Sequence, residues 1–435
     1  MKINRVAKNA TWIIACKIVQ SLLGFVINMF TARYLGPSNF GLITYASSLA
    51  AFVVPIMKLG LNNILVQEIV HHPEREGKAL GTTVFLNVCS SVFCIIGLTT
   101  FAYIANPNEP DTVIVCLLYS INLIFQATEQ LIYWYQAKLM SMYTSVISLI
   151  AYVVVAGYRV FLLATAKNVY WFALSSAFDY LLISIGIYII YRIKGTQKLS
   201  VSLSLGKQMV NISKHYIISS MMVTIFAQTD KIMIKALLGT ESTAYYGTAV
   251  TCAGMTSFVF VAIIDSFRPW IFEAQKQNEE VFKHRLKMLY SFTIYLSLMQ
   301  SVVMTVFAHL IISVIYGAKY MDAVGALQIV VWYTTFSYLG SVRNIWILAN
   351  KKQNYLWIIN ISGASANVIM NVILIPLIGI YGAAIASLVT QFFTNVIIGY
   401  IIKPIRPNNA IMIASLNPKY CIDAFRKLLK RGKND

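Results

Sequence analysis

Positively charged side chains lie inside or beside long apolar runs of this sequence. They are Lys17, Lys58, Arg159, Lys231 and Arg268. A lysine at the centre of a bilayer costs about 2.5–3.5 kcal/mol on insertion scales. Such a residue is retained where it faces a wet cavity, a partner or an anionic ligand. The predominance of cations therefore indicates a site that receives an anion within the membrane.

Snorkelling is the alternative explanation, in which a long side chain reaches the headgroups from near the end of a span. Three cations near predicted membrane edges suit it: Arg33, Lys214 and Lys235. It suits Lys17 and Lys58 less well, because each lies most of two turns from its edge. We therefore expect Lys17, Lys58, Arg159 and Lys231 to face a cavity.

Acidic side chains within the apolar runs are fewer: Glu129, Asp179, Asp230 and Asp265. Asp265 and Arg268 are three residues apart on one helix, a spacing at which side chains can pair. Adjacent helical residues do not face one another, so the partner of Asp230 is expected on another span and not at Lys231. Structural ion pairs are thus one interpretation of these acids.

Ion coupling is the other interpretation, in which a membrane carboxylate takes up H⁺ or Na⁺ as the cavity reorients. Asp179 and Glu129 lack obvious partners on their own helices, which makes them better candidates than Asp230 and Asp265. Beyond such an ion, no cofactor is expected.

Patterns typical of enzymes and metal sites do not occur in the sequence. Neither a nucleophile elbow, a zinc-protease helix, a phosphate-binding loop nor a dinucleotide fingerprint is found. Aromatic clusters at 133–135 and 170–172 fit interfacial belts, with sugar stacking as the alternative. We therefore predict neither a metal site nor catalytic residues.

The elements that must position these side chains are membrane-spanning helices. Hydrophobic residues make up 58% of the 435-residue chain and charged residues 12%, against about 25% charged in globular proteins. Runs long enough to cross about 30 Å of hydrocarbon recur throughout. Twelve spans are predicted, at about 11–34, 41–67, 81–106, 112–135, 142–165, 170–192, 214–238, 243–267, 288–315, 323–348, 355–378 and 380–402. The predicted fold class is an all-α polytopic membrane protein.

Charge in the connecting loops orients the spans. Lys and Arg number 35 against 16 Asp and Glu, and most lie at the N-terminus and in alternate loops. The opposite loops carry only Lys167 and Lys319, and one of them, 105–111, is acidic. The positive-inside rule and the even span count place both termini in the cytoplasm. Because the basic residues flank spans, we expect no nucleic-acid partner.

A parallel repeat relates the two halves of the chain. Superposing Gly36 on Gly239 aligns spans 1 and 2 with spans 7 and 8. It pairs polar residues of span 1 with those of span 7: Lys17 with Ser220, Ser21 with Thr224, and Asn28 with Lys231. These spacings keep each set on one helical face, and Gln20 and Gln228 extend the two stripes. Such repeats are common in transporters.

The repeat predicts two six-helix bundles, at 1–192 and 214–402, joined by a cytoplasmic linker at 193–213. Residues 403–435 form a basic tail. Ile422, Phe425, Leu428 and Leu429 fall at helical spacing within it. An amphipathic helix on an anionic leaflet and a solvated basic tail are both consistent with this pattern.

Sparse motifs across nearly the whole chain resemble those of Wzx-type polysaccharide or O-antigen flippases. That family belongs to the multidrug/oligosaccharidyl-lipid/polysaccharide exporter superfamily. The most specific motif is ARYLGPSNFG at 32–41. Further matching residues are Asn9, Lys17, Gln20, Gly24, Tyr45, Leu59-Gly60-Leu61, Glu68, Asp230-Lys231, Leu238-Gly239, Tyr246 and Gly379 to Ala384.

The resemblance implies MATE-like bundles around a cavity that opens alternately to each side of the bacterial cytoplasmic membrane. The implied substrate is a polyprenyl-diphosphate-linked oligosaccharide, flipped to the outer leaflet for surface polysaccharide such as O-antigen or capsule. A diphosphate cannot cross hydrocarbon unaided, and cations offer it charge-assisted contacts. The candidate binding residues are Lys17, Gln20, Asn28, Lys58, Arg159 and Lys231. The expected partners are membrane lipids, a polysaccharide polymerase and glycosyltransferases.

Two other functions are open on the sequence. A cation-coupled drug or metabolite antiporter of the same superfamily would favour a cavity dominated by carboxylates, whereas Lys and Arg dominate here. A membrane-embedded polysaccharide polymerase or glycosyltransferase would normally bring a sizeable outer loop or soluble domain with clustered catalytic groups, and the sequence shows neither.

Overall fold

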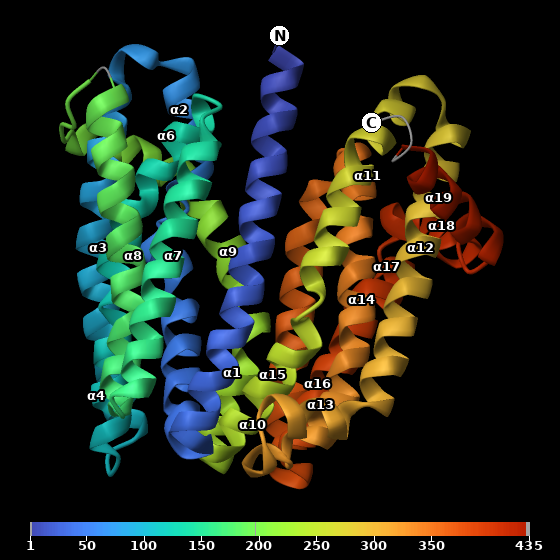
Figure 1. Cartoon of the computed structure of the whole chain (residues 1–435). Helices are drawn as coiled ribbons and strands as arrows, with labels where there is room; N and C mark the ends of the chain where they lie inside the picture. The colour runs from blue at the N-terminus through green and yellow to red at the C-terminus, as the bar shows by residue number, and fades with distance from the viewer. Residues whose placement is uncertain (1, 196, 432–435) are drawn as a thin grey trace. The chain divides into compact units, whose positions relative to one another are not determined.

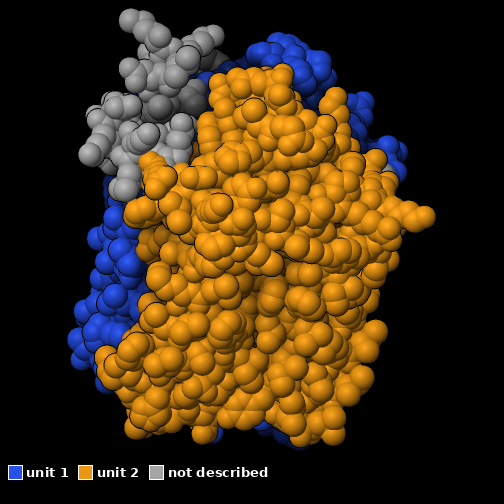
Figure 2. All heavy atoms as spheres, turned by 90° about the vertical axis from the view of Figure 1, so that its right-hand side faces the viewer, with its two compact units in different colours: residues 1–244 blue, residues 245–435 orange. Residues whose placement is uncertain are grey.

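The structure is a computed structural model that describes residues 2–195 and 197–431, with the side chains of 2–14, 215, 219 and 427–431 left outside the description. Within these residues every regular element is helical (Figure 1). The chain forms two compact units, residues 1–244 and 245–435, coloured separately in Figure 2.

The elements of the first unit are α1 (Lys2–Met57), α2 (Leu61–His71), η1 (Pro73–Arg75), α3 (Glu76–Ala105), α4 (Pro110–Ser120), α5 (Asn122–Thr128), η2 (Glu129–Leu131), α6 (Ile132–Ala137), α7 (Ser141–Ala164), α8 (Val169–Lys194) and α9 (Leu203–Leu238). The boundary between the units lies within α10 (Thr240–Gly254). The helix α9 belongs to the first unit, and the predicted division at the linker 193–213 stays a prediction.

The elements of the second unit are α11 (Ser257–Gln277), α12 (Glu279–Val306), α13 (Ala308–Ile315), η3 (Ala318–Tyr320), α14 (Ala323–Ala349), η4 (Gln353–Tyr355), α15 (Leu356–Ile378), α16 (Ile380–Phe392), η5 (Phe393–Ile397), α17 (Ile398–Ile401), η6 (Lys403–Ile405), α18 (Arg406–Ala414) and α19 (Pro418–Arg431). The element η5 is a π-helix. The core of the second unit is built around α12 and α14, which pack directly against each other.

Ten helical stretches in the described residues are long and apolar enough to cross a membrane. This confirms the predicted all-α polytopic class, while the count of twelve spans stays a prediction. The first stretch, Ala15–His71, has 57 residues. At about 1.5 Å per residue it is far longer than a single crossing of about 30 Å requires.

Glycine divides this first stretch at the predicted position. Gly36 leaves the helical conformation with φ 70° and ψ 173°, and Pro37 follows where a new helix starts, a position that proline favours. Gly239, its predicted counterpart in the repeat, has φ 88° and ψ −173° before α10. Both lie in a region that is essentially restricted to glycine. Sequence-related turns thus have the same backbone geometry.

The motif at 32–41 also contains a glycine required by close packing. A Cβ atom built on Gly41 would lie 2.0 Å from the carbonyl oxygen of Thr240. Such a distance is far below van der Waals contact, so a side chain at this position would push α1 away from the start of α10. The helix α1 also packs against α4, α7 and α9.

The second predicted span is interrupted at Lys58, which corrects its expected boundaries of 41–67. The helix α1 ends at Met57, and a turn with left-handed Leu59 and Gly60 leads into α2. The hydroxyl of Ser213 on α9 donates to the carbonyl oxygen of Leu59 at 2.7 Å. Lys58 therefore lies at a helix end, where the macrodipole favours a cation.

The C-terminal tail is helical and packs on α12. Ala424 is fully buried, and the ring of Tyr420 lies beside His284 and Lys287 of α12. Ile422 and Phe425 remain exposed. The side chains of Leu428 and Leu429 lie outside the description. The described part of the tail is therefore helical with one face against the protein, and both interpretations of its role stay predictions.

Candidate binding cavity of the first unit

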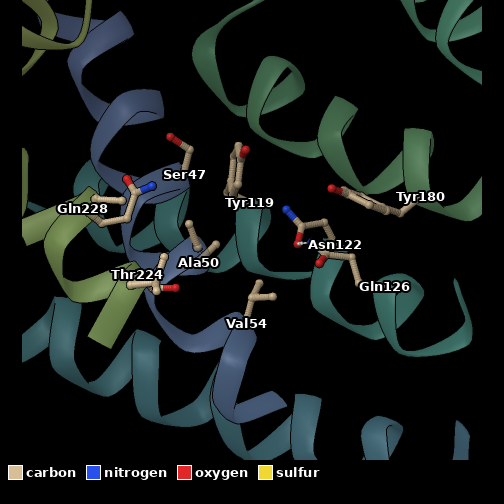
Figure 3. A pocket seen from close by; sticks show the side chains of 12 residues that line it. Ser47, Ala50, Val54, Tyr119, Asn122, Gln126, Tyr180, Thr224 and Gln228 are labelled. Atoms are coloured by element: carbon tan, nitrogen blue, oxygen red, sulfur yellow. Dashed lines mark hydrogen bonds between the residues drawn. The ribbon is translucent and has the colours of Figure 1, made fainter. Parts of the chain in front are cut away.

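A cavity of about 340 Å³ lies within the first unit, between α1, α4, α5, α8 and α9 (Figure 3). The volume is at the lower end of the range for ligand sites, about 300–1,000 Å³. The polar side chains that line it are all neutral: Ser47, Tyr119, Asn122, Gln126, Tyr180, Thr224 and Gln228. Alanine and valine side chains complete the lining.

Polar residues of α5 are held in place by a chain of hydrogen bonds. Gln126 donates through Nε2 to Oδ1 of Asn122 at 3.0 Å. Asn122 donates through Nδ2 to the hydroxyl of Ser176 on α8 at 3.4 Å, and Ser176 donates to the carbonyl oxygen of Ala173 at 2.9 Å. The i, i+4 spacing on α5 places both amides on one face, directed at α8 and the cavity.

Lys231 lies at the border of this cavity. Its Nζ donates to Oε1 of Gln228, one turn earlier on α9, at 3.3 Å. Gln228 itself lines the cavity. A predicted cation is therefore separated from the cavity by a single hydrogen-bonded side chain.

Arg159 and Asp179 form a second charged group, from α7 and α8. Nε of Arg159 donates to the hydroxyl of Ser175 at 2.9 Å, and the charges of Arg159 and Asp179 interact with each other and with the cavity-lining Tyr119. Oδ1 of Asp179 is buried and has no hydrogen-bond partner among the described residues. A buried acceptor of this kind requires a donor, a proton or a cation.

Glu129 and Lys58 form the third charged group. Glu129 begins the short η2 turn after α5, and its charge interacts with that of Lys58 at the end of α1. Glu129 also interacts with Tyr180 of the cavity wall.

None of the predicted binding or coupling residues is part of the cavity lining. On α1, Lys17 is exposed, and Gln20 and Asn28 are half-buried. Asp230 of α9 is buried. Asp265 of α11 forms the predicted pair with Arg268, at 3.0 Å, with both side chains about half exposed.

Lys235 shows that snorkelling was the wrong explanation for one cation. Its side chain is only 2% exposed, and its Nζ lies 2.6 Å from Oε2 of Glu109 in the loop between α3 and α4. The ammonium group of Lys235 and the hydroxyl of Thr112 hold the pKa of Glu109 below its usual value. The sequence feature that could have predicted this pair is Glu109, an acid in a loop that was expected on the other side of the membrane from the basic loops.

Arg343 of α14 is a second buried cation whose position near a span end did not indicate burial. It is 5% exposed, and its Nη1 donates to the carbonyl oxygen of Thr394 in the π-helix η5 at 2.5 Å. That contact depends on a local helix distortion, which hydropathy does not reveal.

The comparisons with known proteins identify the class of this chain. Residues 6–275 match the polysaccharide biosynthesis protein family, and the chain belongs to that family. No curated protein matches it.

Solved structures with the same fold are membrane transporters and a flippase. An inward-facing multidrug resistance MATE transporter of the MOP superfamily has a TM-score of 0.66 and 12% identity, covering 91% of this chain and 96% of its own. The lipid II flippase MurJ, in an inward closed conformation, has a TM-score of 0.66 and 14% identity, covering 96% and 92%. A MOP superfamily transporter from Pyrococcus furiosus has a TM-score of 0.61 and 12% identity, covering 94% and 96%.

Family and fold together confirm the predicted class. The chain is a multi-pass membrane protein of the polysaccharide biosynthesis family with the fold of MOP superfamily transporters. The neighbours named here are transporters and a flippase and not catalysts, which agrees with the prediction that the chain is not an enzyme.

Proposed function

We propose that this protein flips polyprenyl-diphosphate-linked oligosaccharides from the inner to the outer leaflet of the bacterial cytoplasmic membrane. The family assignment and the fold shared with a lipid-linked-substrate flippase support the proposal. The observation that carries it is the neutral polar cavity of the first unit with Lys231 at its border. Both termini lie in the cytoplasm, and the outward product supplies a polymerase for surface polysaccharide.

Lys231 is the residue best supported as a diphosphate contact. A diphosphate carries several acceptor oxygens, and an ammonium group bonds such oxygens more strongly than a neutral donor does. Lys231 contacts only a neutral amide oxygen among the hydrogen bonds described here, so it can exchange that bond for a phosphate oxygen. Lys17, Lys58 and Arg159, with Gln20 and Asn28, complete the proposed path for the headgroup.

Asp179 is the acid best supported as a coupling group. Its buried oxygen without a hydrogen-bond partner in the described structure is a place for H⁺ or Na⁺. Glu129 and Asp230 are weaker candidates, and Asp265 is weakest because it is exposed and paired with Arg268.

A drug or metabolite antiporter of the same superfamily is less well supported. Organic cations call for carboxylates at the site, and none of the residues that line the cavity is acidic.

Deletion of the gene and complementation with variants test the proposal in cells. We expect the deletion strain to lack surface polysaccharide and to accumulate undecaprenyl-diphosphate oligosaccharide on the inner leaflet. Lys231→Ala should complement poorly. Lys214→Ala, an exposed lysine of the same helix bonded to Asn211, is the matched control and should complement fully. A deletion strain with normal surface polysaccharide would show that the protein serves another transport process.

A further inference from the structure

We propose that the cavity of the first unit binds an uncharged sugar residue of the transported lipid, with Gln126, Tyr119 and Tyr180 as the residues that determine its specificity. The inference rests on the proposed function and adds a division of labour to it. The charged border holds the diphosphate, and the neutral cavity holds part of the glycan.

The hydrogen-bond chain on α5 fixes which atom of Gln126 is available. A backbone carbonyl only accepts, so Ser176 must donate to Ala173. Asn122 must then donate to Ser176, which leaves its Oδ1 to accept from Gln126. The free end of Gln126 is therefore its Oε1, an acceptor without a partner among the described residues. An acceptor in this position is suited to a ligand that donates a hydrogen bond.

The two tyrosines add groups that both donate and accept. Tyr119 and Tyr180 come from α4 and α8 and project beside Asn122 and Gln126 (Figure 3). No hydrogen bond to either hydroxyl is found in the described part of the chain. An aromatic ring with a polar tip offers an apolar face and a hydrogen-bonding edge together, which matches the C–H faces and hydroxyl edges of a sugar ring.

The neutral lining of the cavity suits a sugar and not the diphosphate. Phosphate oxygens at neutral pH accept hydrogen bonds and cannot satisfy Oε1 of Gln126. Sugar hydroxyls donate and accept, so they satisfy the amide oxygen and both phenols. The cavity of about 340 Å³ is small for a ligand site, so it fits a part of the glycan and not a whole repeat unit.

Binding to two probes tests the inference on the purified full-length protein. One probe is bare undecaprenyl diphosphate, and the other is the pool of undecaprenyl-diphosphate-linked oligosaccharides extracted from the host strain. We expect Gln126→Leu and Tyr180→Phe each to weaken binding of the glycosylated lipid about tenfold, the upper range for one lost hydrogen bond. Binding of the bare lipid should stay within about twofold. Lys231→Ala should weaken both.

Matched variants control for general damage. Tyr188→Phe lies on the same helix as Tyr180 but is exposed, and Gln136→Leu changes an exposed glutamine of α6. Both should bind like the wild type. If the wild type binds the glycosylated lipid and Gln126→Leu and Tyr180→Phe bind it equally well, this inference is overturned and the proposed function is not. Failure of the wild type to bind either lipid would overturn the proposed function as well.

Discussion

At the scale of single residues, neutral polar side chains and charged side chains occupy different positions around the cavity. The cavity itself carries neutral side chains, and charged residues border it at Lys231, at Arg159 with Asp179, and at Lys58 with Glu129. Charges in a low-dielectric interior are costly without a partner. Neutral side chains accept hydrogen bonds from two of the cations: Gln228 from Lys231 and Ser175 from Arg159.

Asp179 gives the sharpest prediction at this scale. Asp179→Asn keeps the size of the side chain but replaces the carboxylate by a neutral amide. The amide neither takes up a proton nor pairs with a sodium ion as a carboxylate does. We expect transport by this variant in proteoliposomes to lose most of its dependence on an imposed proton or sodium gradient. Asp265→Asn, which changes the exposed acid paired with Arg268, should retain the wild-type dependence. Equal gradient dependence of Asp179→Asn and the wild type would exclude Asp179 as the coupling acid.

At the scale of elements, the breaks in the helices matter as much as the helices. Gly36 and Gly239 both leave the helical conformation with positive φ, 70° and 88°. The turn at 58–60 is bonded to Ser213 of α9, and Lys235 connects α9 to the loop that carries Glu109. These contacts place α9 against α1 and α3 within the first unit and so form one wall of the cavity.

The positive φ angles of Gly36 and Gly239 predict that alanine at either position destabilises the protein, whereas alanine at a helical glycine does not. Gly36→Ala and Gly239→Ala force a side chain into a conformation that costs about 1–3 kcal/mol, so each should lower the thermal unfolding temperature in detergent. Gly97→Ala is the control, since it lies inside α3 with open space around its Cβ position. Alanine favours helices by up to about 1 kcal/mol over glycine, so this control should be neutral or stabilising. Loss of stability in the control but not at Gly36 would refute the assignment.

The ion pair between Glu109 and Lys235 predicts a dependence on pH. The pKa of Glu109 is lowered in the folded protein, so the pair stabilises above the unfolded value of about 4.3 and is lost as pH falls through the lowered pKa. Glu109→Gln should destabilise at pH 7 by less than the about 3–5 kcal/mol of a fully buried pair, because Glu109 is half exposed. The difference from wild type, measured by thermal unfolding, should shrink below about pH 4. A difference independent of pH would show that the pair does not stabilise electrostatically.

The sequence predicts the spans well and their interruptions poorly. Apolar runs predict the helices directly, and the sequence Gly36-Pro37 predicts the turn between the first two spans. The breaks at Lys58 and at the π-helix η5 coincide with contacts from other helices, from Ser213 to Leu59 and from Arg343 to Thr394, which hydropathy does not contain.

The same contrast applies to the candidate site. Cations stand out in an apolar background, so the sequence singles out Lys231 and Arg159, whose roles stay predictions. It does not single out Asn122 and Gln126, because a neutral polar residue in a span is equally suited to helix–helix hydrogen bonding. Only the packing of α5 against α8 shows that they converge with Tyr119 and Tyr180 on one cavity.

At the scale of the whole molecule, the chain is a multi-pass membrane protein of the polysaccharide biosynthesis family with the fold of MOP superfamily transporters. The first unit combines a cavity of ligand size with nearby cations, a combination suited to a headgroup with one charged and one uncharged part. Alternating access would let that headgroup cross while the polyprenyl chain stays in the bilayer.

The most direct test is flipping by the purified protein in liposomes. Undecaprenyl-diphosphate-linked oligosaccharide from the host strain would be incorporated with the protein, and the fraction of glycan accessible to an external glycosidase would be followed over time. We expect the initially protected half to become accessible in liposomes with the wild type but not in protein-free liposomes, and Lys231→Ala to slow this step at least about tenfold. Wild-type liposomes whose protected glycan stays protected would contradict the assignment of this protein as a flippase.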